Sequence, residues 1–162
     1  MYNPHTDIMN EVYLKQAYVY ANNSQDLNTQ NGALLIHPTK GILLGAYSSL
    51  PNRIQSTPDK WKSDCYVVSA EMNLLCKANE RGLPTMGLIV CCPWFSSCES
   101  AKAIVQAGIT KVITHKDMST LMNYNVSMIE ILQEAGIEYI QWEGKVGEDL
   151  FSIKVNGEDF FP

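Results

Sequence analysis

The apolar positions near the start of the chain repeat with helical spacing. They are Ile8, Val12, Leu14, Tyr18 and Val19. This stripe predicts a helix over residues 6–21, which the polar cluster at 22–26 ends. Two short apolar runs follow at 33–36 and 42–47. The segment between them contains Pro and Gly, which predicts that the two runs pair as a β-hairpin.

Further along, helical patterns alternate with short apolar runs. The helical patterns cover 70–79, 97–108 and 127–135, and the strand-like runs cover 88–92, 111–114, 137–140 and 151–155. Ser96 and Glu99 match a capping box at the start of the 97–108 helix. The polar segment 48–64 contains Pro51 and Pro58, and we expect it to be a surface loop.

The order of these elements predicts an α/β fold. A helix, then a hairpin, then alternating helices and strands gives a mixed central sheet of about five strands. Helices should cover both faces of the sheet, so we expect a three-layer α/β/α arrangement. The pattern contains no repeat and no linker, so residues 1–162 should form a single domain.

The composition narrows the possible partners. A net charge of −5 and a pI near 5.1 argue against binding to duplex nucleic acid, which normally needs a basic face. No apolar run approaches the ~20 residues that span a bilayer, so we expect no membrane partner. The start of the chain lacks a signal-peptide pattern, and the five cysteines show no disulfide framework, which predicts a cytoplasmic protein. A small anionic ligand such as a nucleotide is compatible with this charge, because helix N-termini bind phosphate.

Five segments, in order, resemble the cytidine/deoxycytidylate deaminase family, and in particular its deoxycytidylate deaminase branch. They are 26–33, 46–51, 58–61 with 69–73, 93–104, and 127–128 with 135–137. The stretch WFSSCESAKAI within 93–104 is similar to the family's W-F-P-C-x-x-C-A-K-A-I, and SAE at 69–71 to its H-A-E. The resemblance implies a cytidine-deaminase-like fold, a pyrimidine nucleotide ligand and a homo-oligomer.

The differences from that pattern lie at the positions that would hold the catalytic metal. In the family, one His and two Cys hold a catalytic zinc, and a Glu moves the proton. In this chain Ser69, Ser97 and Ser100 occupy the three ligand positions, and Glu71 occupies the position of the Glu. A neutral serine hydroxyl is not among the groups that hold zinc in proteins. We therefore expect no zinc cofactor and no metal site, although the family implies one.

Two further serines stand at family positions, Ser96 in place of the Pro and Ser48 in place of a loop Asn that contacts substrate. The main hypothesis is a pseudoenzyme that binds a nucleotide or regulates a partner. One alternative is an enzyme acting on a pyrimidine nucleotide such as dCMP, with Glu71 and either no metal or a metal held in another way. A second alternative is an interaction or assembly subunit with a vestigial pocket. The predicted ligand-binding residues are Ser48, Ser69, Ser97, Ser100, Asn28 and Trp94.

Each candidate also has a structural interpretation. Serines at helix starts can be N-caps, and Glu71 can complement the positive end of its helix. Cys98 is either a nucleophile or an inert thiol, whereas Cys91 and Cys92 should pack in the core.

The remaining candidates are aromatic, basic and metal-binding side chains. Trp61, Tyr66 and Phe95 either stack on a base or pack, with packing favoured for Tyr66, and Arg53 either meets a phosphate or is a solvated charge. A substitute metal site would draw on Cys65, Cys98, His37 and His115.

Overall fold

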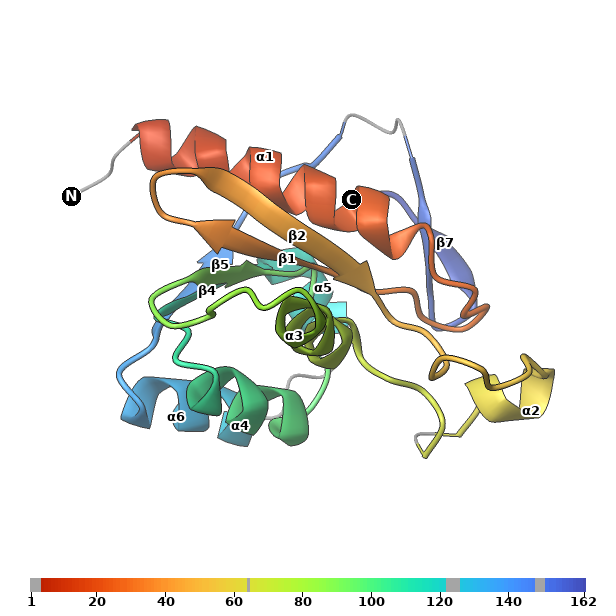
Figure 1. Cartoon of the computed structure of the whole chain (residues 1–162). Helices are drawn as coiled ribbons and strands as arrows, with labels where there is room; N and C mark the ends of the chain where they lie inside the picture. The colour runs from red at the N-terminus through yellow and green to blue at the C-terminus, as the bar shows by residue number, and fades with distance from the viewer. Residues whose placement is uncertain (1–3, 64, 122–125, 148–150) are drawn as a thin grey trace.

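The computed structural model describes residues 4–63, 65–121, 126–147 and 151–162 (Figure 1). Its helices and strands follow the predicted order. They are α1 (Pro4–Ala21), β1 (Gly32–His37), β2 (Gly41–Tyr47), α2 (Pro58–Trp61), α3 (Ala70–Glu80), β3 (Ile89–Cys91), α4 (Cys98–Gln106), β4 (Lys111–His115), α5 (Lys116–Leu121), α6 (Val126–Glu134), β5 (Glu138–Trp142), β6 (Ile153–Val155) and β7 (Glu158–Phe160).

The central sheet has five strands in the order β2-β1-β3-β4-β5. Strand β1 is antiparallel to both β2 and β3, while β3, β4 and β5 run parallel to one another. The predicted mixed sheet with an antiparallel opening pair is therefore confirmed. The carboxyl end of β3 leads into residues 92–97 and then into α4, so this edge of the sheet is where a ligand site is expected in an open α/β fold.

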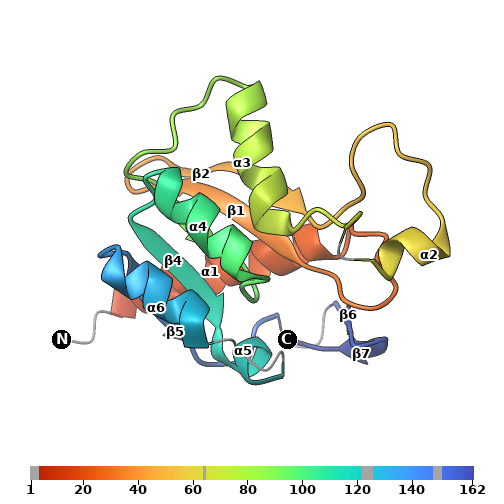
Figure 2. The ribbon, with the colours of Figure 1, turned by 90° about the horizontal axis from the view of Figure 1, so that it is seen from below.

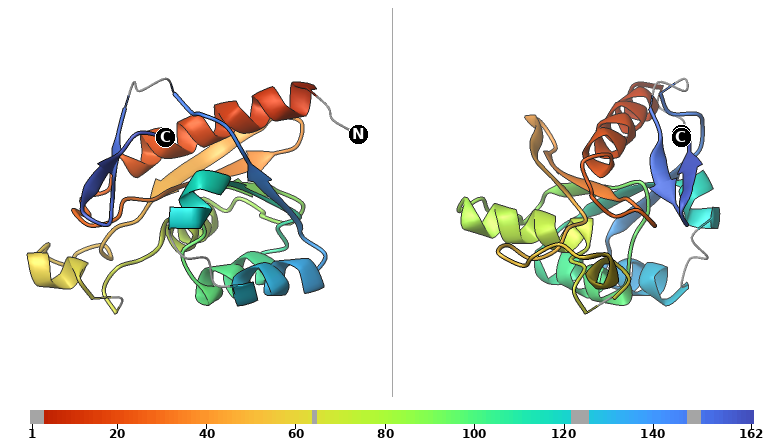
Figure 3. Two further views of the ribbon diagram at one scale, coloured as in Figure 1. Left: turned by 180° about the vertical axis from the view of Figure 1, so that it is seen from behind. Right: turned by 90° about the vertical axis from the view of Figure 1, so that its right-hand side faces the viewer.

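Helices cover both faces of the sheet, which confirms the predicted three-layer α/β/α arrangement. Figure 2 shows α3, α4 and α6 across one face, and Figure 3 shows α1 and the β6–β7 hairpin on the other. Alternate strand residues divide between the two cores. Leu35 and Val90 pack with α3, α4 and α6, whereas Leu34 and Cys91 pack with α1. Cys91 and Cys92 are fully buried, as predicted.

Helix α1 lies unusually close to strand β1 at Gly32. A Cβ atom added there would lie 2.2 Å from the carbonyl oxygen of Ala17 and 2.5 Å from the amide nitrogen of Ala21. Only glycine allows this approach of two backbones. The contact fixes the point at which the α1–β1 loop enters the sheet, and residues of that loop form one wall of the pocket described below.

Some elements differ from the prediction. The short helices α2 and α5 were not predicted, because each spans six residues or fewer and has no apolar repeat of its own. The predicted terminal strand over 151–155 contains β6, which pairs with β7 in a separate two-stranded sheet. The predicted loop over 48–64 is interrupted by α2, which stands away from the body in Figures 1 and 2. Residue 64, the last residue of the predicted loop, lies outside the described residues. Within the described ranges, no helix combines the length and the apolarity needed to cross a membrane.

The predicted capping box at α4 is wrong. The N-cap is Ser97, whose side chain accepts a hydrogen bond from the backbone N–H of Ser100. The hydroxyl of Ser96 instead donates to the carboxylate of Glu71, 25 residues earlier in the chain. A tertiary partner therefore replaces the local one that the capping box would supply.

Candidate functional site

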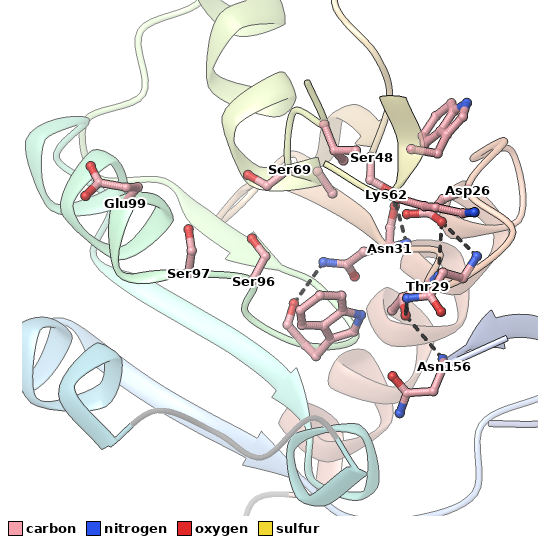
Figure 4. A pocket seen from close by; sticks show the side chains of 15 residues that line it. Asp26, Thr29, Asn31, Ser48, Lys62, Ser69, Ser96, Ser97, Glu99 and Asn156 are labelled. Carbon is pink, nitrogen blue, oxygen red and sulfur yellow. Dashed lines mark hydrogen bonds between the residues drawn. The ribbon is translucent and has the colours of Figure 1, made fainter. Parts of the chain in front are cut away.

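A pocket of about 820 Å³ opens where the starts of α3 and α4 meet the α1–β1 loop (Figure 4). Its polar and aromatic lining residues are Asp26, Asn28, Thr29, Asn31, Ser48, Trp61, Lys62, Ser69, Trp94, Ser96, Ser97, Glu99 and Asn156. In Figure 4 the hydroxyls of Ser69, Ser96 and Ser97 converge at one end. Asp26, Thr29, Lys62 and Asn156 lie toward the other end. The pocket is thus lined by hydroxyls and the Glu99 carboxylate at one end, and by Lys62 and Asp26 near the other.

Four serines, Ser69, Ser96, Ser97 and Ser100, form what we call the serine cluster. The hydroxyl oxygen of Ser100 lies 3.0 Å from those of Ser69 and Ser96, and 3.3 Å from that of Ser97. Ser69 and Ser97 are the N-caps of α3 and α4, accepting from the backbone N–H of Met72 and Ser100 respectively. The structural interpretation therefore holds for these two serines, and the same capping positions bring their oxygens together.

Glu71 lies in the first turn of α3 and is fully buried. One carboxylate oxygen, Oε1, accepts the backbone N–H of Ser96 at 2.9 Å, and the other, Oε2, accepts the Ser96 hydroxyl at 2.8 Å. Glu71 is not among the residues that line the pocket. It therefore lies behind the serine cluster, where the side chains of Ser96 and Ser69 both hydrogen-bond it.

Burial controls the protonation of the groups around Glu71. Removal from water raises the pKa of the Glu71 carboxyl above its ordinary value, while its hydrogen bonds, including those from Ser96, oppose this rise. The pKa of the Cys92 thiol is also raised, mainly by burial and further by the nearby Glu71 charge. Cys92 is therefore a neutral thiol.

The other predicted ligand-binding residues also line the pocket, each in a different setting. Ser48 is buried, and its oxygen accepts the backbone N–H of Asn31. Asn28 is exposed at the rim and donates to the Thr29 hydroxyl. Trp94 is half-buried, and its indole N–H has no partner among the described residues. The structure thus brings Ser48, Asn28 and Trp94 to one cavity with the serine cluster.

Among the other aromatic candidates only Trp61 lines the pocket. Phe95 is buried in the core, so the prediction that it could stack on a base is wrong. Tyr66 is exposed outside the pocket, where the Lys60 ammonium lies 5.7 Å from its ring centre. Arg53 is an exposed loop residue away from the pocket, as expected for a solvated charge.

The substitute metal site is not formed. No group of three His, Cys, Asp or Glu side chains in the described part of the chain is placed to hold a metal ion. His115 is buried on the α1 side of the sheet, 2.6 Å from the Tyr18 hydroxyl and 2.8 Å from the Gly144 carbonyl oxygen. Cys98, the candidate nucleophile, is half-buried in α4 and does not line the pocket.

Several pocket residues were not predicted from sequence. Asn31 is buried, with its side chain donating to the Trp94 carbonyl at 3.0 Å, and Lys62 is the cation on the pocket lining. Asn31 lies within the 26–33 segment that resembles the deaminase family. That resemblance could have identified Asn31 as a pocket residue. Lys62 follows a short helix in an irregular segment, and nothing in the local sequence distinguishes it from other surface lysines.

The oxygens of the serine cluster do not suit zinc. Zinc in proteins is held by thiolate, imidazole or carboxylate. The cluster supplies neutral hydroxyls that are already bonded to one another and to backbone N–H groups. The buried Glu71 carboxylate is occupied by Ser96, and the Glu99 carboxylate on the pocket wall is bonded by Lys102. This end of the pocket is instead suited to hydrogen-bonding a small polar group.

Comparisons with known proteins bear on the fold. No family model matches the chain. Deoxycytidylate deaminases from Homo sapiens and Pongo abelii are each 28% identical to it over 116 residues, covering 66% of this chain. The aligned region spans 64% of the length of each of those proteins.

Solved structures with the same fold include the dCMP deaminase of cyanophage S-TIM5. Its apo form matches with a TM-score of 0.65 at 22% identity, and its complex with dCMP and dUMP with 0.66 at 21%. These matches cover 86% and 87% of this chain and 99% of the phage chain in each case. A deaminase/reductase from Thermotoga maritima matches at 0.59 and 19% identity, over 85% of this chain and 37% of that one. The fold is therefore the three-layer fold of the cytidine deaminases.

Proposed function

We propose that this protein is a member of the deoxycytidylate deaminase family that binds a pyrimidine nucleotide without a catalytic zinc. The serine cluster carries the proposal. It lies at the starts of α3 and α4. Three of its members are the residues that the sequence resemblance aligns with the zinc ligands, namely Ser69, Ser97 and Ser100. A site in which all of these positions are hydroxyls can hold a ligand but cannot hold the metal.

The pocket has the size and polarity for a nucleotide. Small-molecule sites in proteins commonly have volumes of roughly 300–1,000 Å³, and this pocket has about 820 Å³. The serine cluster would face the base. Asn28, Asn31 and Ser48 would contact the sugar region, and Trp61 and Lys62, which also line the pocket, would contact the phosphate. The related phage enzyme has been solved with dCMP and dUMP, which supports a ligand of this class.

Without the metal, the residues present would bind and orient a nucleotide but would not activate water. In the zinc enzymes the metal lowers the pKa of its bound water from ~15.7 to ~7. No group on the pocket wall replaces that effect, since Glu71 lies behind Ser96. We therefore assign the protein a binding or regulatory role. Assembly into a homo-oligomer remains an expectation from the family, which light scattering on the purified protein would test.

Titration calorimetry with dCMP, dCTP, cytidine and ADP tests the proposal. We expect binding of dCMP with a dissociation constant in the micromolar range or below, and weaker binding of ADP, whose purine and diphosphate need more room. A thermal shift provides a second readout, because a ligand at 100 times its dissociation constant adds about 2.7 kcal/mol of stability. Absence of any response to the pyrimidine ligands would contradict the proposal and favour a vestigial pocket.

A further inference from the structure

The loop between β2 and α3 is anchored to the rest of the protein at its two ends. At this base, Ser49 and Val68 exchange backbone hydrogen bonds of 3.1 and 2.8 Å. The side chain of Asn73 on α3 strengthens the base by donating to the Ser49 hydroxyl at 2.8 Å. Residues 50–63 and 65–67, which we call the α2 segment, extend outward from this base (Figure 2).

The α2 segment is held together by its own contacts. Helix α2 has no buried residue, and none of the described residues of the segment belongs to either hydrophobic core. The Trp61 indole N–H donates to the Ser56 hydroxyl at 2.9 Å, and the Lys60 ammonium donates to the Gln55 carbonyl oxygen at 2.8 Å. Every hydrogen bond of a described residue in the segment has its partner within the same loop. The segment can therefore move as one body about its base and break few contacts.

A second cavity, of about 440 Å³, lies between the α2 segment and the α1–β1 loop. The two sides of this cavity are lined by residues 25–28 of the loop and by residues 56–58, 61 and 62 of the segment. On the loop side, the Leu27 side chain is 79% exposed. On the segment side, Pro58 and Trp61 supply apolar surface. Bringing the two sides together would remove this apolar surface from water, which is favourable.

Two opposite charges lie on the walls shared by this cavity and the 820 Å³ pocket. Asp26 of the α1–β1 loop and Lys62 of the α2 segment line both, and both lie toward the same end of the pocket in Figure 4. The Asp26 carboxylate is buried, and its Oδ1 accepts the backbone N–H groups of Asn28 and Thr29. Lys62 is exposed, and no acid among the described residues forms an ion pair with it. Movement of the segment toward the loop would bring these two charges together.

We propose that the α2 segment is a lid that closes on the α1–β1 loop when a nucleotide binds. On closure Trp61 packs against Leu27, and Lys62 lies between the Asp26 carboxylate and the phosphate of the ligand. A ligand stabilises a closed state only if it binds that state more tightly than the open one. The lid meets this condition because it carries Trp61 and Lys62, which line the pocket. The inference rests on the proposed function for the ligand that triggers closure.

Leu27 distinguishes closure from direct contact with the ligand. It lines the cavity under the lid but not the pocket, and its side chain is exposed in this open form. Leu27→Ser should therefore keep the thermal stability of the free protein. It should speed dissociation of dCMP about tenfold, which corresponds to about 1.4 kcal/mol, and change the association rate little. Stopped-flow mixing measures both rates. The control is Met86→Ser, which changes an 83% exposed side chain outside both cavities and should leave the rates unchanged.

Disulfide trapping tests the movement itself. Gln25→Cys and Thr57→Cys place one thiol on each side of the cavity and outside the pocket, in a background where the exposed Cys65 and Cys76 are replaced by Ser. The Thr57 side chain makes no capping hydrogen bond, so its replacement removes none. A disulfide requires Cα atoms within about 7 Å of each other, so the bond should form when the lid closes. The control pair is Gln25→Cys with Met86→Cys, which closure does not bring together.

We expect the disulfide to form slowly in the free protein and about tenfold faster with saturating dCMP, because the ligand raises the closed population. The control pair should form none. If the disulfide forms but dCMP does not bind, the lid stands and the nucleotide function fails. If dCMP binds but does not speed the disulfide, or if Leu27→Ser leaves dissociation unchanged, the lid is overturned and the nucleotide function stands. If dCMP does not bind and no disulfide forms, both are overturned.

Discussion

The hydroxyl of Ser96 lies 2.8 Å from Oε2 of Glu71, and the backbone N–H of Ser96 lies 2.9 Å from Oε1 of the same carboxylate. One residue of the β3–α4 loop thus occupies both oxygens of a fully buried acid on α3. This pair separates Glu71 from the pocket and connects it to the serine cluster.

The purified protein should contain no stoichiometric zinc. The oxygens at the converging helix starts are neutral hydroxyls, which are not zinc ligands in proteins. Elemental analysis by mass spectrometry, after dialysis against zinc-containing and then metal-free buffer, measures the content per chain. About one zinc per chain that is lost in Ser69→Ala or Ser100→Ala would contradict the prediction.

Deamination of dCMP, dCTP and cytidine should not exceed the background rate. An attacking water without a metal keeps a pKa near ~15.7, so hydroxide is scarce at neutral pH. Chromatography of the uracil products over many hours gives the rate. Glu71→Gln is the matched variant, since it removes the family's proton-transfer group while retaining the shape of the side chain. Turnover in the parent protein that disappears in this variant would favour an active enzyme.

The triple variant Ser69→His, Ser97→Cys and Ser100→Cys should bind zinc. The hydroxyl oxygens at these positions lie 3.0 and 3.3 Å apart, so longer imidazole and thiolate groups can surround one ion and leave a fourth position for water. Missing support around the new His could weaken the site by about 10–100-fold. Zinc titration against a competing chelator measures the affinity.

The control for this experiment is Ser69→Ala, Ser97→Ala and Ser100→Ala, which removes the same hydroxyls without adding ligands. Both triple variants lose the two N-cap side chains, each of which contributes about 0.5–2 kcal/mol, so their thermal stability should fall by similar amounts. If the His and Cys variant folds and yet binds zinc no better than the Ala variant, the assignment of these positions is wrong.

The stability of the folded protein should depend on pH through Glu71. Its pKa is higher in the folded state than in the unfolded state because it is buried. Between these two pKa values the folded state holds a proton that the unfolded state has released, so the free energy of unfolding falls as the pH rises. Above the folded-state pKa the loss is complete, and below the unfolded-state value of ~4.3 it is absent.

Glu71→Gln does not titrate and should lack this contribution. Relative to the parent protein, it should gain stability as the pH rises from about 4 through the folded-state pKa of Glu71, by about 1.4 kcal/mol for each tenfold difference in proton affinity between the two states. Urea unfolding at several pH values gives the free energies, with Glu80→Gln as the exposed control. A difference between Glu71→Gln and the parent protein that stays constant with pH would show that Glu71 does not titrate differently on folding.

The sequence by itself determined the elements and their order. Helical and strand-like spacing depends on side chains a few residues apart, and it located α1, the β1–β2 hairpin, α3 and α4 to within a few residues. It also identified the segments that resemble the deaminases, and so the serines at the starts of α3 and α4. These features are local, which is why a linear pattern records them.

The tertiary structure decided how the serines are used. Ser96 and Ser97 are adjacent and chemically identical, and the sequence favoured Ser96 as the cap. Folding places Ser96 against Glu71, 25 residues away, and brings Ser69 to Ser100, 31 residues away. Folding also pairs β6 with β7 in a separate sheet. It places Lys62 on the wall of the pocket. The physical reason is that a buried carboxylate must find hydrogen-bond donors in space, and which donors it meets depends on how the helices pack on the sheet.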